Sequence, residues 1–316
     1  MPRGADLFAV PTADTTVTVR VPAKVNLFLG CGLLREDGFH ELTTVFHAVS
    51  LFDEVTVRES DGLSVTITGE GSDGVVPLDD TNLAVRAARL LGERLGLEPD
   101  VPLALHKGIP VAGGMAGGSA DAAGTLVALD ALWSAGLTRE ALDELAAELG
   151  SDVPFALHGG TALGVGRGDR LSSVLARGDY HWVFALADGG LPTPAVYAEL
   201  DAWRANADPR PVPSPDAVFA ALRSGNAKAL GAALVNDLQV AAIRLRPGLR
   251  RTLEAGRELG ALGSVVSGSG PTCAFLVPSA ADALSLAASL SAAGVCRAVR
   301  TAHGPVHGAR IVATEI

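Results

Sequence analysis

Apolar and polar positions alternate along the first part of the chain. The segment from Thr16 to Gly30 (TVTVRVPAKVNLFLG) repeats this alternation with period two, which is typical of a β-strand, and Pro22 predicts a break or bulge within it. Similar patterns predict strands near His40 to Leu51, Glu54 to Glu59 and Leu63 to Thr68. These segments predict a sheet in the N-terminal part of the protein.

Helical spacing and capping residues follow these strands. Leu83 to Leu95 carries apolar residues at helical spacing, and Asn82 in the preceding DDTN is a suitable N-cap. A second helix is predicted from Ser119 to Gly136, and Thr138 is expected to cap a third helix that runs to Gly150. Strands and helices are therefore mixed in this half of the chain, which predicts a mixed α/β domain.

The second half begins a new pattern at Trp182, where WVFALAD has the composition of a buried strand. A Pro-rich loop (207–216) and several helices precede a strand, a glycine loop and a strand in ALGSVVSGSGPTCAFLVP. A helix from Ala280 to Ala293 and a last strand follow, which together predict an antiparallel sheet with helices on one face. The whole protein is expected to be α+β, with domains at residues 1–178 and 179–316.

The composition is that of an ordinary globular protein that binds small molecules. Hydrophobic residues make up 48% of the 316 residues, and the net charge of −10 argues against broad binding to nucleic acids or membrane surfaces. The N-terminal segment lacks the apolar core of a signal peptide, and the most apolar later run, 280–299, is interrupted by Asp282. We expect no membrane span and a cytoplasmic location.

Cysteine and histidine spacing does not indicate a disulfide framework or a metal centre. The three cysteines, Cys31, Cys273 and Cys296, are far apart and odd in number, which fits a reducing compartment. His303 and His307 are spaced like a pair of metal ligands, but no nearby residue completes such a site, and a polar surface loop is the alternative. No protein metal centre is therefore predicted.

A glycine-rich loop, PVAGGMAGGSADAAG (110–124), leads into the helix predicted at Ser119. Such loops bind phosphate because backbone N–H groups can approach the ligand closely and the helix dipole favours negative charge. A Walker loop is excluded because Ser119 stands where its lysine should follow Gly118, and the Rossmann and protein-kinase fingerprints are absent. A phosphate loop of another kind and a plain tight turn remain as alternatives.

The residues of this loop resemble the phosphate loop of the GHMP family of small-molecule kinases, P-x-x-x-G-L-G-S-S-A. Pro110, Gly114 and Met115 match the layout, whereas Ala116 replaces a family glycine and is expected to tighten the backbone. The resemblance implies a two-domain GHMP kinase fold that uses ATP and Mg²⁺, with the Mg²⁺ held by ATP, Ser119 and few other groups. The implied ATP-binding residues are Pro110, Val111, Ala112, Gly113, Gly114, Met115, Ala116, Gly117, Gly118, Ser119 and Ala120.

Five segments resemble, in the same order, one member of this family, which phosphorylates the 2-hydroxyl of a cytidine diphosphate derivative of methylerythritol in the non-mevalonate isoprenoid pathway. The segments are PAKVNLFLG (22–30), DGFHEL (37–42), LGSDVPFAL (149–157), LPTPAVY (191–197) and SGSGPTCAF (267–275). Kinases of the same family acting on homoserine or mevalonate, and a nucleotide-binding module without turnover, remain alternatives. An RNA-binding protein with this N-terminal fold is disfavoured by the net charge of −10.

Two charged residues in these segments are candidates for catalysis. Alternation along the first strand places Lys24 and Asn26 on the same face, and a solvated strand face is the simple alternative for Lys24. A helix N-cap is the simple alternative for Asp152, which precedes Pro154, and the two roles can coexist. The resemblance implies that Lys24 neutralises charge on the transferring phosphoryl group and that Asp152 accepts the proton of the acceptor hydroxyl.

The resemblance also implies where the cytidine-containing substrate binds. Phe39, His40 and Tyr197 would form the cytosine pocket, with an aromatic ring on each face of the base and the histidine at its polar edge. Family members often have tyrosine at the position of Phe39, so stacking is expected to survive and a phenol contact to be lost. Packing on the core is the alternative for Tyr197. The other implied substrate-binding residues are Asn26, Gly268, Ser269 and Gly270. We expect a monomer or a weak homodimer.

Overall fold

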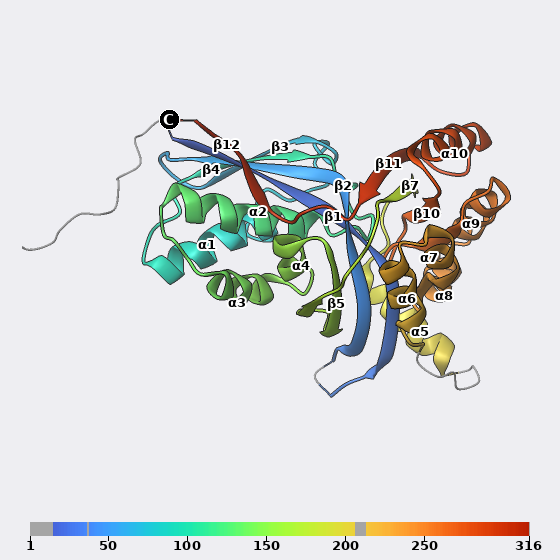
Figure 1. Cartoon of the computed structure of the whole chain (residues 1–316). Coiled ribbons are helices and arrows are strands. Elements are labelled where there is room, and N and C mark those ends of the chain that lie inside the picture. Colours follow the sequence, from blue (N-terminus) through green and yellow to red (C-terminus); the bar gives the residue numbers. More distant parts are fainter. Residues whose placement is uncertain (1–14, 37, 206–212, 316) are drawn as a thin grey trace, which may run out of the picture.

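The computed structural model describes residues 15–36, 38–205 and 213–315, which form two sheets with helices packed against them (Figure 1). The cyan and green helices of the first half lie on one side of the molecule, and the orange and red helices of the second half lie on the other. The N-terminal segment 1–14, Asp37 of the DGFHEL motif and most of the predicted Pro-rich loop lie outside the described residues, as does residue 316.

The first sheet has eight strands and is built around one long antiparallel pair. Its strands are β1 (Thr16–Leu34), β2 (His40–Arg58), β3 (Ser64–Gly69), β4 (Pro102–Lys107), β5 (Thr161–Gly166), β6 (Arg170–Ser173), β8 (Val235–Asn236) and β12 (Arg310–Glu315). The main order is β12-β1-β2-β4-β3, with β5 and β6 continuing from β2 and β8 beside β1. The β3–β4 and β1–β8 pairs are parallel and the other pairs antiparallel, so the sheet is mixed.

The strand β1 is buried along most of its length and carries the candidate lysine. Its register against β2 shifts between Pro22 and Ala23, which confirms the bulge predicted at the proline. Pro22 pairs with Phe52 while Ala23 pairs with Val49, so β2 contributes two extra residues at this point (52 − 49 − 1). The prediction of two separate strands, near residues 40–51 and 54–59, is wrong. Both segments belong to β2, which accommodates the break in alternation as a bulge within one strand.

Four helices pack on one another and on the first sheet. They are α1 (Leu83–Leu95), α2 (Gly117–Leu132), α3 (Arg139–Leu149) and α4 (Val153–His158). The side chains of Asn82 and Thr138 accept hydrogen bonds from the backbone N–H groups of Ala84 and Ala141, which confirms both predicted N-caps.

The helix α2 is shifted from its predicted bounds and lies very close to the sheet. It begins at Gly117 rather than Ser119, and it ends before Gly136 because Ser134 adopts a left-handed conformation (φ 51°). A Cβ at Gly124 would come within 2.7 Å of Cγ2 of Val55 on β2. The small residues of α2 therefore let the middle of the helix sit directly against β2.

The second sheet has four antiparallel strands in the order β11-β7-β10-β9. The strands are β7 (Tyr180–Leu186), β9 (Gly263–Val266), β10 (Cys273–Val277) and β11 (Ala298–Gly304). The helices of this half are α5 (Thr193–Arg204), α6 (Asp216–Ser224), α7 (Ala227–Ala233), α8 (Gln239–Leu245), α9 (Gly248–Glu258) and α10 (Ala280–Ala293). The predicted antiparallel sheet of an α+β fold is confirmed.

Alternate residues of β7 enter two different hydrophobic cores. Val183 and Ala185 pack with residues of α5, α8, α9 and α10, whereas Trp182 and Phe184 join the larger core that also contains β1, β2 and α2. This arrangement follows from the period-two geometry of a strand that is buried on both faces. The second sheet is therefore packed against the first through this shared core.

His47 on β2 is buried against Tyr180 of β7 with 5.7 Å between ring centroids, and its Nδ1 lies 2.9 Å from Oγ1 of Thr161. Burial lowers the pKa of His47 to about 3. The unfolded chain, in which a histidine has a pKa of about 6.5, therefore binds more protons than the folded chain between these two values. Stability is expected to fall as the pH drops from about 6.5 towards 3, by about 1.4 kcal/mol per pH unit from this residue.

Denaturant unfolding at several pH values measures this effect. His47→Asn, whose amide can still pair with Thr161, should lose stability less steeply than the wild type below about pH 6.5. The exposed His106→Asn serves as the control and should follow the wild-type slope. Equal slopes for the wild type and His47→Asn would contradict the prediction.

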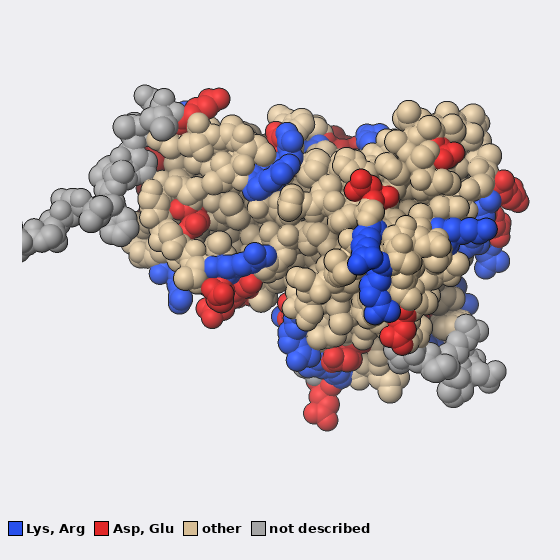
Figure 2. Space-filling view, in the orientation of Figure 1, with Lys and Arg blue, Asp and Glu red and all other residues tan. Residues whose placement is uncertain are grey.

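Acidic and basic side chains lie beside one another on the face shown in Figure 2. Surface ion pairs include Arg20 with Glu54 at 2.7 Å and Arg35 with Glu41 at 2.9 Å.

None of the helices in the described part of the chain has the length and apolar composition needed to cross a membrane.

Candidate active site

A cavity of about 530 Å³ lies where the glycine-rich loop, the middle of β1 and the loop between β9 and β10 meet. The predicted residues that line it are Lys24, Asn26, Asp152, Tyr197, Gly268, Ser269, Gly270 and residues 110–118 of the glycine-rich loop. Four other predicted residues, Phe39, His40, Ser119 and Ala120, are not among its lining residues. The fold therefore brings both candidate catalytic residues to the glycine-rich loop.

The two candidate catalytic residues face each other at this cavity. Nζ of Lys24 lies 3.6 Å from Oδ2 of Asp152, although the residues are 128 positions apart (152 − 24). Lys24 is 6% exposed, so the alternative of a solvated strand face is wrong. Asp152 stands at the N-cap position of α4 without a capping hydrogen bond from its side chain, so its carboxylate is available to Lys24 and to a ligand.

Lys24 is held by several neighbours. Its Nζ donates a hydrogen bond of 2.7 Å to Oδ1 of Asn26, which confirms that the two side chains share a strand face. Nζ also lies 5.5 Å from the ring centroid of Phe46, within range of a cation–π interaction. The backbone N–H of Lys24 donates to the oxygen of Met115 at 3.2 Å, so the strand and the glycine-rich loop are tied together.

The glycine-rich loop is shaped by left-handed residues and by contact with a second glycine loop. A Cβ at Gly114 (φ 73°) would lie 2.2 Å from the backbone oxygen of Ser267, so no larger residue fits there. Ala116 has φ 64°, a conformation that favours glycine, which explains why its replacement of a family glycine strains the backbone. The first N–H groups of α2 follow at Gly117, and with the helix dipole they form an anion-binding end at the cavity.

Ser119 lies within the first turn of α2 rather than at its start. Ala116 occupies the N-cap position, so Ser119 does not cap the helix. The glycines at 117 and 118 are already helical, because the left-handed residue before them ends the loop.

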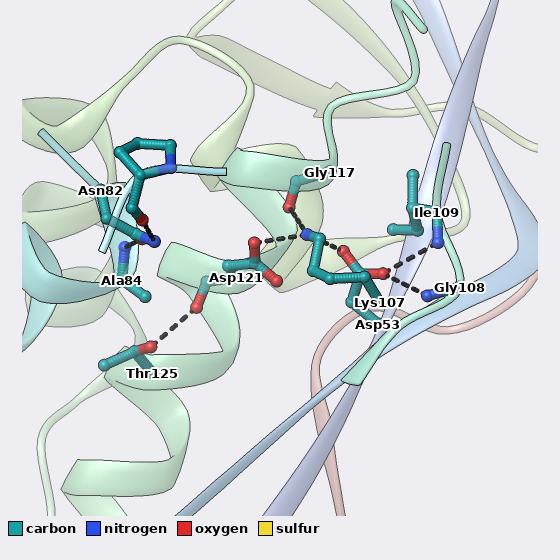
Figure 3. Close-up of polar contacts among 10 residues, drawn as sticks. Asp53, Asn82, Ala84, Lys107, Gly108, Ile109, Gly117, Asp121 and Thr125 are labelled. Carbon is teal, nitrogen blue, oxygen red and sulfur yellow. Dashed lines mark hydrogen bonds and ion pairs between the residues drawn. The ribbon is translucent and has the colours of Figure 1, made fainter. Parts of the chain in front are cut away.

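A buried cluster of one cation and two carboxylates lies beside the end of this loop (Figure 3). Lys107, the last residue of β4, donates hydrogen bonds to the carboxylates of Asp53 on β2 and Asp121 on α2, and a third to the backbone oxygen of Gly117 at 3.2 Å. Oδ1 of Asp53 also accepts from the two backbone N–H groups that follow Lys107, both at 2.8 Å. The cluster joins β2, β4 and α2 at the point where the loop becomes a helix.

Burial and the charge of the oppositely charged partners act in opposite directions on the pKa values of Asp53, Lys107 and Asp121. Burial raises the pKa of the Asp121 carboxyl to about 7, because Lys107 offsets only part of the cost of burying its charge. Burial also raises the pKa of Asp53, against the opposing effect of Lys107. Burial alone would lower the pKa of Lys107, but the carboxylates of Asp121 and Asp53 outweigh it and raise that pKa. The ammonium of Lys107 is thus engaged within the cluster.

Comparisons with known protein families agree with the loop and the two-sheet fold. The family model of the GHMP kinases N terminal domain matches residues 82–160, and that of the GHMP kinases C terminal region matches residues 218–296. The chain belongs to the GHMP kinase family. As the loop resemblance implied, this protein is therefore an ATP-dependent small-molecule kinase.

Individual GHMP kinases resemble this chain over nearly its whole length. The 4-diphosphocytidyl-2-C-methyl-D-erythritol kinase of Mycolicibacterium smegmatis is 61% identical over 317 residues, which cover 96% of this chain and 98% of the relative. The enzyme of the same name from Mycobacterium avium is 59% identical over 303 residues, covering 96% and 95%. A crystal structure of 4-(cytidine 5'-diphospho)-2C-methyl-D-erythritol kinase is 36% identical, with a TM-score of 0.74, and covers 90% of this chain and 98% of that one.

The residues predicted to form a cytosine pocket in this GHMP kinase do not all face the cavity. His40 stacks on Tyr197 with 5.0 Å between ring centroids, and its Nε2 lies 2.9 Å from Oδ1 of Asp201, so this nitrogen already has a polar partner. Phe39 is half exposed, and the guanidinium of Arg167 lies 5.0 Å from the centroid of its ring. Tyr197 and Arg167 therefore present their groups to the cavity while His40 supports Tyr197.

Several cavity residues were not identified from the sequence. They include Val75, Val76, Pro77, Thr81, Asn82, Leu83, Arg167 and Thr193. Asn82 is predicted only as an N-cap, and Arg167 lies between two glycines in the turn that follows β5. Lys107 shares a strand face with the buried Leu103 and Leu105, and this pattern was the signal that could have indicated a buried lysine.

The residues of the site do not build a metal centre of their own. Among the described residues, no group of three or more His, Cys, Asp or Glu side chains is placed to hold a metal ion. Asp121 is engaged by Lys107, and Ser119 does not line the cavity. The implied role of Ser119 as a Mg²⁺ ligand therefore finds no support in this geometry.

Proposed function

We propose that this GHMP kinase transfers the γ-phosphoryl group of ATP to the 2-hydroxyl of 4-diphosphocytidyl-2-C-methyl-D-erythritol and releases ADP, in non-mevalonate isoprenoid precursor biosynthesis. The observation that carries the proposal is the pair of Lys24 and Asp152, 3.6 Å apart, in one cavity with the glycine-rich loop. The relatives at 59% and 61% identity that are named for this kinase support the choice of acceptor.

The arrangement of charged groups supports a direct transfer. The phosphates of ATP bind at the N-terminal end of α2, where backbone N–H groups and the helix dipole favour anions. The acceptor oxygen attacks the γ-phosphorus, its proton passes to the carboxylate of Asp152, and the bond from the γ-phosphorus to the oxygen of ADP breaks. Lys24 donates to the transferring group and neutralises the charge that develops there. The protein contributes position and charge, and the Mg²⁺ that we expect arrives bound to the phosphates of ATP.

The acceptor is tested by an ADP-release assay with the cytidyl compound, mevalonate and homoserine in parallel. We expect turnover with the cytidyl compound and none above background with the other two. Turnover with another acceptor alone would overturn the substrate assignment, and binding of ATP without turnover on any acceptor would favour a nucleotide-binding module.

Tyr197→Leu is expected to raise the KM of the cytidyl acceptor about 10-fold or more, because stacking on an aromatic ring contributes about 1–3 kcal/mol per base. The KM of ATP should stay close to that of the wild type, since Tyr197 is not part of the glycine-rich loop. Burial raises the pKa of the Tyr197 hydroxyl, so this group remains neutral at ordinary pH.

Tyr197→Phe is the matched control and should keep the acceptor KM near the wild-type value, since the ring is retained. Initial rates at varied concentrations of each substrate measure both constants. A change confined to the KM of ATP would contradict a base-stacking role for Tyr197.

Three further properties belong to this proposal. The chain is proposed to divide into domains at residues 1–178 and 179–316, with the division in the connection between β6 and β7, although β8 and β12 of the second part return to the first sheet. A cytoplasmic location fits the three free cysteines of the structure. A monomer or weak homodimer is proposed, and light scattering at two protein concentrations tests it.

A further inference from the structure

A continuous chain of buried hydrogen bonds runs from Thr44 on β2 to the ammonium of Lys24. The hydroxyl of Thr44 donates to the backbone oxygen of Phe28 at 2.7 Å and accepts from Nδ2 of Asn26 at 2.8 Å. Oδ1 of Asn26 accepts from Nζ of Lys24 at 2.7 Å. Thr44 and Asn26 line the cavity, but each is only 1% exposed. Thr44 is thus linked to the candidate catalytic lysine through one side chain.

The direction of this chain follows from the number of protons available. A threonine hydroxyl has one proton, and Thr44 gives it to the oxygen of Phe28, so towards Asn26 the hydroxyl can act only as an acceptor. Asn26 therefore turns its NH₂ group to Thr44 and its oxygen to Lys24. The reversed amide would place the NH₂ group against the ammonium and one oxygen against another. Thr44 and Lys24 therefore both select this orientation of Asn26, one from each end of the amide.

The irregular register of the β1–β2 pair places Thr44 beside this amide. Asn26 pairs with Phe46, but Phe28 pairs with Val45, so β1 has one extra residue between the two pairs. The next residue of β2, Thr44, then lies close to both the carbonyl of Phe28 and the side chain of Asn26. Bulges often redirect a side chain towards an active site. This bulge brings the hydroxyl of Thr44 within hydrogen-bonding distance of Asn26.

Once Asn26 holds Lys24, the ammonium has little freedom. A Cβ at Gly268 would lie 3.2 Å from Nζ of Lys24, and the ring of Phe46 lies on another side of the group. Asp152 at 3.6 Å is too distant for a short hydrogen bond, so it does not fix the lysine by itself. The shortest contact of the ammonium is the one to Asn26.

We infer that Thr44 is a positioning residue for phosphoryl transfer, which acts through Asn26 to hold Lys24 where it meets the transferring group beside Asp152. The inference rests on the roles proposed above for Lys24 and Asp152. It also changes the role of Asn26, which the sequence resemblance assigned to substrate binding. The amide oxygen of Asn26 accepts a hydrogen bond from Lys24, and one of its N–H groups donates to Thr44 on β2.

Thr44→Val tests the inference because it keeps the shape of the side chain and removes the hydroxyl. The kcat with ATP and the cytidyl acceptor is expected to fall about 10- to 100-fold, since a displacement of about 1 Å can cost about 10²-fold in rate. The KM of each substrate should change less than about threefold, because the interaction lost is made in the transition state. Thr44→Ser keeps the hydroxyl and should recover most of the kcat.

A double-mutant cycle with Lys24→Met separates positioning from a general loss of stability. In the Lys24→Met background, Thr44→Val should lower kcat by less than about threefold, because the group through which it acts is gone. Thr252→Val is the matched control, since Thr252 is 4% exposed and its hydroxyl donates to the oxygen of Val295 away from the cavity. It should lower the thermal midpoint without lowering kcat.

Three results would overturn the inference: a wild-type kcat in Thr44→Val, equal losses in Thr44→Val and Thr44→Ser, or a full multiplicative loss in the double variant. A wild-type kcat in Lys24→Met would instead overturn the proposed role of the lysine. Failure of the inference and failure of the proposed function are therefore distinguishable.

Discussion

Replacement of Asp152 by Asn is expected to lower kcat/KM by about 10²- to 10³-fold, which corresponds to about 3–4 kcal/mol of transition-state stabilisation. Asparagine has nearly the same shape, but it cannot take the proton of the acceptor hydroxyl. The substitution also removes the negative charge that lies 3.6 Å from Nζ of Lys24. ATP binding should remain close to that of the wild type, because Asp152 lies outside the glycine-rich loop.

Steady-state ADP release measures this loss, and calorimetric titration with ATP measures nucleotide affinity in the same preparation. Asp282→Asn is a suitable control, since Asp282 is an exposed carboxylate in the first turn of α10. It should leave both quantities unchanged. Retained turnover in Asp152→Asn would contradict the role of Asp152 as the proton acceptor.

Lys107→Met is expected to lower the free energy of unfolding by about 3–5 kcal/mol, because removing one partner of a buried ion pair leaves uncompensated charge. Asp53, Lys107 and Asp121 are 0%, 3% and 2% exposed, so water cannot take the place of the ammonium. The substitution also removes the donor to the backbone oxygen of Gly117, where α2 begins. The KM of ATP should therefore rise in the fraction that remains folded.

Denaturant unfolding of Lys107→Met and of Lys228→Met provides the comparison, because Lys228 is an exposed lysine on α7. Lys228→Met should change the free energy of unfolding by about 0.5 kcal/mol or less. A loss below about 1 kcal/mol in Lys107→Met would show that the cluster does not depend on its cation.

Local features of the chain were predictable because their causes lie within a few residues. Asn82 and Thr138 cap helices through contacts to residues two and three positions later, and a proline predicts a bulge wherever it falls in a strand. The shared face of Lys24 and Asn26 follows from strand geometry alone. The glycine-rich loop is likewise recognisable from a short stretch of sequence.

Features that depend on distant segments were not predictable in this way. The cluster around Lys107 joins carboxylates 54 positions before it and 14 positions after it, and no local pattern indicates that they meet. The two extra residues of β2 look like a turn until the register of β1 is known. The contact of His40 with Tyr197 depends on how the β1–β2 hairpin lies against α5, which the residues of neither segment specify.

The pairing of β12 with β1 has a consequence for the synthesis of the chain. Thr16 pairs with Glu315, so the strand that carries Lys24 has one of its edge partners among the last residues described. During translation this partner leaves the ribosome only after almost every other element has emerged. The N-terminal sheet can form its β1–β2 pair early, but that edge of β1 stays open until then. Contacts of such long sequence separation slow folding, so we expect the β1–β12 pair to form later than the β1–β2 pair.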